Sequence, residues 1–170
     1  MTRLNESNKK PVSNMNSVLC TLLLLVFTAQ LNAANNKWET GKIKDSATGK
    51  SACTLFTPKI EINDGYGDSS IQLFLYRNRL EIKTGSNIDG SRKDVGIQVD
   101  LNPLIPVEQV KLETIGVFKN SLPVILKQFK AGGNVQVKMR FWPSWPETAV
   151  VPASFSLVGF TAAYNGCWNK

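Results

Sequence analysis

Short runs of alternating apolar and polar residues recur from Lys37 onward, and they limit the possible fold more than any other feature of the sequence. In one such run, Val135, Val137 and Met139 alternate with polar and basic residues. A side-chain period of two is that of a β-strand with one buried face. Seven or so runs follow one another at intervals of roughly ten residues, separated by turn residues. We therefore expect a mostly β fold, either an antiparallel β-sandwich or a flattened barrel.

One segment, residues 121–131, has the pattern of a short α-helix. Ser121 can act as its N-cap, and Pro123 is tolerated in the first turn because the amide there has no intrahelical acceptor. Gly132 and Gly133 can end the helix, since glycine accepts the left-handed conformation at the C-terminal end. The predicted buried face of this helix comprises Leu122, Ile125, Leu126 and Phe129.

Two further local predictions concern a hairpin and the end of the chain. Arg77 and Asn78 separate two alternating runs, which indicates a β-hairpin with a tight turn. Near the C-terminus, an apolar strand is expected from Ser154 to Phe160, followed by about one helical turn over residues 161–164.

The N-terminus has the pattern of a secretory signal peptide. Lys9 and Lys10 precede a stretch without charge, whose apolar part, residues 18–29, is too short to span a bilayer. Ala33 offers a small residue for cleavage, and an uncleaved amphipathic anchor is the alternative. We therefore predict a signal peptide over residues 1–33, a single β-sandwich domain over 34–170, and a periplasmic or extracellular location.

Removal of Arg3, Glu6, Lys9 and Lys10 with the signal leaves 17 of the 20 basic and 12 of the 13 acidic side chains, a net charge of +5. This charge favours anionic partners such as phosphorylated lipid, acidic glycan or nucleic acid. The charges are dispersed, however, so a solvated, soluble surface is the preferred explanation, and no specific nucleic acid is expected.

Two cysteines, Cys53 and Cys167, remain after Cys20 leaves with the signal. In an oxidising compartment such a pair normally closes, so a disulfide is predicted. It would enclose more than 100 residues and stabilise the fold by about 4 to 5 kcal/mol on the loop-entropy model.

The chain contains no histidine, which removes the commonest general base and histidine-dependent nucleophiles and metal sites. Asp64 and Asp68 flank a turn and could approach a calcium ion, or could act with Glu61 in a small hydrolase. The full ligand series of a calcium loop is missing, and a plain loop explains these residues too. We expect no enzyme activity and no cofactor.

Two groups of residues are candidates for binding. Lys138 and Arg140 would form an anion-binding face if their sheet also carried other basic strands, although a charged sheet exterior explains them as well. Trp142 and Trp145 could form a platform for a sugar ring or a partner protein, or could cover the open end of the core. The other basic residues considered for the first group are Arg77, Arg79 and Lys83.

The residues Leu126-Lys127-Gln128-Phe129-Lys130-Ala131-Gly132-Gly133, a following strand, and Phe155-Ser156-Leu157-Val158-Gly159-Phe160-Thr161-Ala162-Ala163-Tyr164 resemble the C-terminal half of the invasion-associated locus B family. The resemblance covers about a third of the chain well. It implies an exported bacterial β-sandwich, without enzyme activity or cofactor, that in pathogens aids entry into host cells. Its partner would be an envelope or host protein, a glycan or an anionic lipid.

The sequence departs from the pattern of that family at two places. Family members often carry extra cysteines before the central helix, where this chain has Val117-Phe118-Lys119-Asn120. The segment Trp142 to Pro146 is also particular to this sequence. A periplasmic carbohydrate- or lipid-binding module, using this aromatic loop and the basic sheet face, is the alternative function.

Overall fold

A computed structural model describes residues 37–44, 49, 51–143 and 149–168 of the chain. All of these belong to one compact unit, Ala33–Lys170. The signal peptide predicted for residues 1–33 lies outside the described residues. Within the part of the chain that is described, no helix has both the length and the apolar character needed to cross a membrane.

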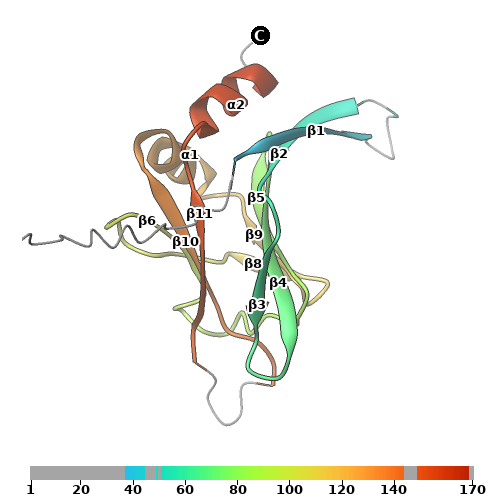
Figure 1. The fold of residues 1–170 in the computed structure, drawn as a ribbon, viewed down its shortest axis with the longest axis vertical. Coiled ribbons are helices and arrows are strands. Elements are labelled where there is room, and N and C mark those ends of the chain that lie inside the picture. The colour runs from blue at the N-terminus through green and yellow to red at the C-terminus, as the bar shows by residue number, and fades with distance from the viewer. Residues whose placement is uncertain (1–36, 45–48, 50, 144–148, 169–170) are drawn as a thin grey trace, which may run out of the picture. The chain divides into compact units, whose positions relative to one another are not determined.

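The described strands form two antiparallel sheets, and they do not close into a barrel, so the sandwich alternative of the prediction is confirmed (Figure 1). The larger sheet has the order β1-β2-β4-β5-β9-β8, with β3 also paired to β4, and the smaller has the order β11-β10-β6-β7. The elements are β1 (Glu39–Lys44), β2 (Ser51–Phe56), β3 (Ile60–Asn63), β4 (Asp68–Tyr76), β5 (Arg79–Thr84), β6 (Gly96–Val99), β7 (Ile105–Pro106), β8 (Gln109–Lys111), β9 (Ile115–Phe118), α1 (Leu122–Ala131), β10 (Asn134–Met139), β11 (Val151–Ser156) and α2 (Phe160–Trp168).

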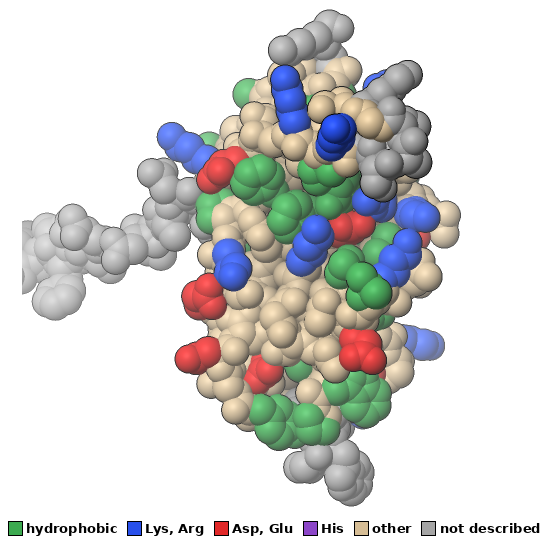
Figure 2. Space-filling view, turned by 90° about the vertical axis from the view of Figure 1, so that its right-hand side faces the viewer, with side chains coloured by type: hydrophobic (Ala, Val, Ile, Leu, Met, Phe, Trp, Pro, Cys, Tyr) green, Lys and Arg blue, Asp and Glu red, His purple; other side chains and the backbone are tan. Residues whose placement is uncertain are grey.

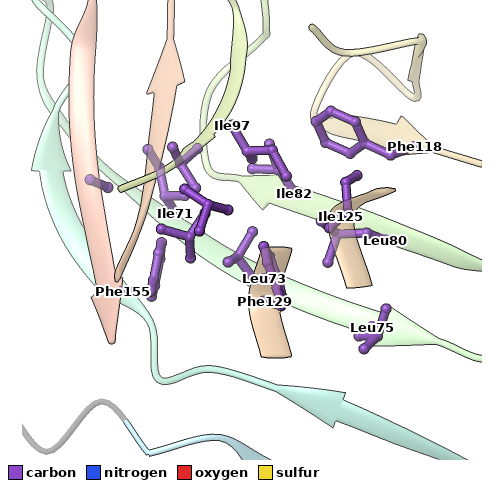
Figure 3. Packing of buried hydrophobic residues seen from close by; sticks show 14 of the residues in the cluster. Ile71, Leu73, Leu75, Leu80, Ile82, Ile97, Phe118, Ile125, Phe129 and Phe155 are labelled. Carbon is purple, nitrogen blue, oxygen red and sulfur yellow. The ribbon is translucent and has the colours of Figure 1, made fainter. Parts of the chain in front are cut away.

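The core is built from the apolar positions of the alternating strands, as expected from their period of two. Ile71, Leu73 and Leu75 on β4 are fully buried, and Val135, Val137 and Met139 on β10 are buried with them. Figure 3 shows side chains from β4, β5, β6, β9, β11 and α1 converging in this region. Burial of apolar surface at about 25 cal/mol per Å² is the main force that holds the elements together. The residues labelled there are Ile71, Leu73, Leu75, Leu80, Ile82, Ile97, Phe118, Ile125, Phe129 and Phe155.

Strand β4 is paired along its two halves with different partners on the same side. Its first half pairs with β3, where Ile60 lies opposite Ile71, and its second half pairs with β2, where Leu55 lies opposite Leu75. On its other side β4 forms the predicted hairpin with β5, joined by the turn at Arg77. The β1–β2 hairpin is therefore placed beside the β4–β5 turn.

The predicted helix is α1, whose Leu122, Ile125 and Phe129 are buried. Ser121 is the N-cap residue, as predicted, but its side chain makes no hydrogen bond to the helix amides. Instead, the carboxylate of Glu108 accepts hydrogen bonds from the backbone N–H groups of residues 119–121 and from the Ser121 hydroxyl. A carboxylate near a helix N-terminus also interacts favourably with the helix dipole.

The end of α1 differs from the prediction at Gly132. This residue has φ −91° and ψ 168°, so its backbone is extended and not left-handed. Glycine is needed there for space, since a Cβ would lie 2.5 Å from Cγ1 of Val99 and 2.8 Å from Oδ2 of Asp100. Close packing of the helix end against β6, and not backbone conformation, therefore explains this glycine.

The C-terminal segment forms a second helix, which is longer than the single turn predicted over residues 161–164. The last strand ends at Ser156 and not at Phe160, and α2 continues to Trp168 in place of one turn. Tertiary packing explains this helix: the ring centroid of Phe160 lies 5.0 Å from that of Trp38 and 5.2 Å from that of Phe129. Gly159, at φ 82°, separates the strand from the helix.

Candidate functional site

Among the residues that the structure describes, Trp142 and Tyr66 are exposed aromatic residues near the end of β10. The side chain of Trp142 is 53% exposed, and its backbone N–H donates a hydrogen bond of 2.9 Å to the carbonyl oxygen of Asn87. The hydroxyl of Tyr66, which is 57% exposed, donates a 2.9 Å hydrogen bond to the carbonyl oxygen of Pro143. The β3–β4 turn thus holds the segment that follows Trp142. The other predicted platform residue, Trp145, lies outside the described residues.

Trp142 also borders a hollow of about 250 Å³ that presents several polar groups. Two of its carboxylates are already used by the fold. Asp89 is buried and accepts hydrogen bonds from the backbone and hydroxyl of Ser91, and Glu108 caps α1. The hollow can therefore offer Trp142 and a polar wall to a ligand, but not two free carboxylates for acid–base catalysis. Its lining residues are Asp89, Gly90, Ser91, Val107, Glu108, Gln109, Val110 and Trp142.

The pKa of Glu108 shows how firmly this carboxylate is held as an anion. Partial burial acts to raise its pKa, but the hydrogen bonds from the Ser121 side chain and from the N–H groups of Asn120, Ser121 and Lys119 outweigh it and lower the pKa to about 2. Hydrogen bonds donated to the charged form of a carboxyl group favour that form.

Lys138 and Arg140, the predicted basic face, each have a polar partner: Gln98 on β6 and Asp94 in the segment before β6, respectively. Nζ of Lys138 donates a 2.7 Å hydrogen bond to Oε1 of Gln98. Nε and Nη2 of Arg140 bond both carboxylate oxygens of Asp94, at 2.7 to 3.0 Å. The Arg140 guanidinium lowers the pKa of Asp94, which remains ionised. The positive charge of Arg140 is thus largely balanced.

This face does not combine with the other basic strands. Lys138 lies on β10 of the four-stranded sheet, whereas Arg79 and Lys83 lie on β5 of the seven-stranded sheet, next to Arg77. The condition for one continuous basic face is therefore not met, because the two groups belong to different sheets, and the ordinary charged exterior of a sheet remains the explanation of Lys138 and Arg140.

The carboxylates of the β3–β4 turn have a structural role. Oδ1 of Asp64 accepts hydrogen bonds of 2.8 Å from the backbone N–H groups of Tyr66 and Gly67, and Oδ2 accepts one of 2.5 Å from Ser86. These bonds, led by the one from Ser86, lower the pKa of Asp64. Among the described residues, no group of three or more acidic or cysteine side chains is arranged to hold a metal ion. Asp64 therefore orders a turn, as expected of the plain loop.

A groove that the sequence analysis did not predict lies between the β1–β2 hairpin and the β4–β5 turn. It has a volume of about 470 Å³. Three basic residues line it, Lys44, Arg77 and Arg79, and no carboxylate does so among the residues that the structure describes. Tyr76 and Ile43 supply apolar surface to the same groove, and Ile43 is 39% exposed.

The groove continues onto a sheet face where rings and cations alternate. The guanidinium carbon of Arg79 lies 3.9 Å from the ring centroid of Tyr76, and Nζ of Lys83 lies 4.1 Å from that of Phe74. Glu81 is buried between the two cations, 2.6 Å from Arg79 and 3.9 Å from Lys83. Figure 2, which views the side on the right of Figure 1, shows Lys, Arg and hydrophobic side chains intermixed over its upper half.

The disulfide lies at the edge of this groove. Cys53 on β2 lines the groove and is bonded to Cys167 on α2, with the two Cα atoms 5.7 Å apart. The pairing predicted from the sequence is the one that the structure contains. It ties the β1–β2 hairpin, which forms one wall of the groove, to the C-terminal helix.

Sequence reasoning could have found half of this groove. The turn at Arg77 and Asn78 was predicted, and its basic residues are visible in the sequence. The opposite wall, Ile43 and Lys44, is more than 30 residues away, and only the pairing of β2 with β4 brings it close. Comparisons of the chain with protein-family models, with curated proteins and with solved structures found no match.

Proposed function

We propose that this chain is an exported, non-enzymatic binding protein of the bacterial envelope, similar to the invasion-associated locus B proteins. The observation that carries the proposal is the disulfide between Cys53 and Cys167, which are separated by 114 positions. Disulfides of this kind persist in oxidising compartments and are rare in the cytosol. The signal-peptide pattern ending at Ala33 supports the same location, the periplasm or the exterior of the cell.

The engagement of the acidic side chains supports a non-enzymatic role. Asp64 orders the β3–β4 turn, Glu108 caps α1, and Asp94 pairs with Arg140. The sequence has no histidine to act as a general base beside them. The protein would therefore act by binding an envelope or host partner, and aid to host-cell entry is the role that the resemblance implies in pathogens.

Export can be tested on the full chain produced in a bacterium. We expect the periplasmic fraction to contain a chain that begins at residue 34 by mass and has no free thiol. The control is Leu24→Arg, which interrupts the apolar part of the signal and should keep the chain uncleaved. An uncleaved wild-type chain in the cytosol, with Cys53 and Cys167 both reactive toward a thiol reagent, would contradict the proposal.

A second candidate function is a carbohydrate- or lipid-binding module that uses Trp142. The observation that favours it is the exposed indole beside a hollow of about 250 Å³ with polar lining residues. An indole can stack on the apolar face of a sugar ring while nearby amide and hydroxyl groups bond its hydroxyls. The contribution of Lys138 and Arg140 would be small, since Gln98 and Asp94 already bind them.

Tryptophan fluorescence can test this second function. Titration with neutral envelope oligosaccharides and with lipid vesicles should shift the emission of the protein, and Trp142→Phe should remove that shift. Trp168→Phe, on the half-buried side of α2, is the matched control and should retain it. A shift that survives the loss of Trp142, or no shift with any oligosaccharide or vesicle, would contradict the proposal.

A further inference from the structure

We propose that the groove between the β1–β2 hairpin and the β4–β5 turn binds an acidic sugar, one that carries carboxylate or phosphate groups. This site is separate from the hollow at Trp142, and the inference does not depend on the functions proposed above. It goes beyond them because it assigns a ligand class to residues that neither function uses.

The charge of the groove favours an anion. Lys44, Arg77 and Arg79 line it; Glu81 already pairs with Arg79 from the adjoining face, and the lining residues that the structure describes include no carboxylate to balance Lys44 and Arg77. The acid on the adjoining face, Glu81, is shared between Arg79 and Lys83. Arg77 is exposed, and its planar guanidinium can bond two oxygens of one carboxylate or phosphate group.

The apolar part of the groove favours a ring beside that anion. The guanidinium of Arg79 covers the ring of Tyr76 at 3.9 Å, which fixes both groups in place. Tyr76 and the half-exposed Ile43 then give an apolar surface next to the cations. A sugar ring with an oxyanion substituent has the matching combination of an apolar face, hydroxyl groups and negative charge.

The groove is also large enough for a small molecule, and its walls are held by the fold. Its volume of about 470 Å³ is within the roughly 300 to 1,000 Å³ of small-molecule sites. One wall is a tight hairpin turn, and the other is tied to α2 by the disulfide at Cys53. A site whose walls are already ordered loses little conformational entropy when it binds.

The distribution of exposed apolar residues favours a sugar over a membrane surface. Proteins that dock on anionic membranes present large apolar side chains beside their cations. Among the large exposed apolar residues described, Ile43 is the one that lines the groove, and it is only 39% exposed. Leu101 and Val158, at 99% and 75% exposed, lie in other parts of the fold.

Isothermal titration of the oxidised protein can test the assignment with four probes: tetragalacturonate, 6-phosphorylated maltotetraose, neutral maltotetraose and phosphatidylglycerol vesicles. We expect at least one acidic oligosaccharide to bind and neutral maltotetraose not to bind. The acidic probe that binds tells which oxyanion is preferred. Lys44→Gln and Arg77→Gln should each weaken this binding by about tenfold, as expected for loss of one charge-assisted contact. Higher salt should weaken it further.

Two control variants separate this site from general charge and from the hollow at Trp142. Lys111→Gln removes the same charge as Lys44→Gln from an exposed position at the opposite edge of the same sheet, and should not change binding. Trp142→Ala should not change it either. All four positions are exposed, so the variants are expected to stay folded, which a thermal unfolding scan checks.

Several results would overturn the assignment. If Lys111→Gln weakened binding of the acidic oligosaccharide as much as Lys44→Gln does, the binding would reflect nonspecific charge attraction. If neutral maltotetraose bound as tightly as the acidic oligosaccharides, the negative charge would not be what the groove recognises. Loss of binding with Trp142→Ala, but not with Lys44→Gln or Arg77→Gln, would show that the sugar binds in the hollow at Trp142 and not in this groove. Binding of vesicles alone would indicate a membrane surface, and no binding of either acidic oligosaccharide would reject the ligand class.

Discussion

The two basic faces of this protein carry similar residues, but their charges have different surroundings. On the four-stranded sheet, Arg140 is bonded to both carboxylate oxygens of Asp94, and Lys138 to Gln98. At the rim of the seven-stranded sheet, Arg77 and Lys44 line a groove in which the described residues include no carboxylate. Similar charges therefore give a balanced surface in one place and an anion-attracting groove in the other.

The difference shows that the count of basic residues on a strand does not identify a binding face. What matters is whether a hydrogen-bond acceptor on a neighbouring strand or loop already binds the basic side chain. Asp94 is 46 positions from Arg140 in sequence, and the antiparallel pairing of β6 with β10 brings the segment before β6 alongside. The Arg140 side chain is only 14% exposed and is paired, so it offers little net charge to a ligand, because the Asp94 carboxylate already balances most of it.

The largest expected effect comes from removing the disulfide beside the groove. Cys53→Ser with Cys167→Ser should lower the free energy of unfolding by about 4 to 5 kcal/mol, because the unfolded chain is no longer closed into a loop. Urea unfolding measures this. Hydrogen exchange should also show that amides of β1 and β2 lose more protection than those of β10, since α2 no longer holds the hairpin.

The matched comparison for this variant is the wild-type protein in reductant, which should show the same loss. If the loss were below about 1 kcal/mol, the bridge would not constrain the unfolded chain as the loop-entropy model requires. Equal loss of protection in β1 and β10 would mean that the groove wall does not depend specifically on the bridge.

An intermediate effect is expected at Glu108, whose partners are backbone N–H groups and not a cation. Glu108→Gln should lower the free energy of unfolding by about 1 kcal/mol near neutral pH, as expected for a lost helix cap on an exposed carboxylate. The folded-state pKa of about 2 lies below the ordinary value of 4.5. The stabilisation is therefore present above pH 4.5 and is lost as pH falls toward 2.

Urea unfolding of wild type and Glu108→Gln at a series of pH values checks this sign. The difference between the two proteins should shrink to near zero at pH about 2, where Glu108 becomes protonated. Glu61→Gln on β3, an exposed strand position, is the control and should change stability by less than about 0.5 kcal/mol. A difference that stays constant with pH would show that the charge of Glu108 does not stabilise α1.

The smallest effect on stability, and the most direct test of the comparison, is expected for Asp94→Asn. The Asp94 side chain is 45% exposed, so loss of its ion pair should cost less than about 1 kcal/mol. The variant should nevertheless bind acidic oligosaccharide at a second, weaker site, because Arg140 then lacks the Asp94 carboxylate. Titration with tetragalacturonate measures this, and Lys44→Gln in the same chain should not remove the added binding.

Unchanged binding in Asp94→Asn would show that carboxylate pairing is not what distinguishes the two faces. The difference would then arise from shape: the groove is a hollow of about 470 Å³ with a tyrosine in its wall, whereas Arg140 follows the end of β10 and its side chain is only 14% exposed.

Much of the fold was predictable because it depends on local patterns. The period of two in β4 and β10 identified their buried faces, and the helical spacing of Leu122, Ile125 and Phe129 identified α1. The disulfide was predicted because Cys53 and Cys167 are the two cysteines that remain after removal of the signal peptide. Elements with weak local signals were predicted only in part: α2 was expected as a single turn, and its full length depends on contacts of Phe160 with Trp38 and Phe129.

The candidate site was less predictable, for a related reason. The sequence indicated the basic residues and the exposed Trp142, but not which cations have acceptors. Glu108, which precedes Ser121 by 13 positions, accepts hydrogen bonds from backbone N–H groups at the start of α1. Gly132 must be a glycine because Val99, on a strand distant in sequence, packs against it. No local pattern contains such contacts.

By itself, the sequence determined the strand and helix patterns, the cysteine pair and the total charge, because each depends on residues read in order. Only the tertiary structure decided which cations are balanced and which are available. That depends on which residues strand pairing brings together. Asp94 lies within hydrogen-bonding distance of Arg140. The β1–β2 hairpin brings Lys44 into the same groove as Arg77, and the described residues that line this groove include no carboxylate. Strand pairing places residues from distant parts of the chain together, so the electrostatics of a surface follow from the fold.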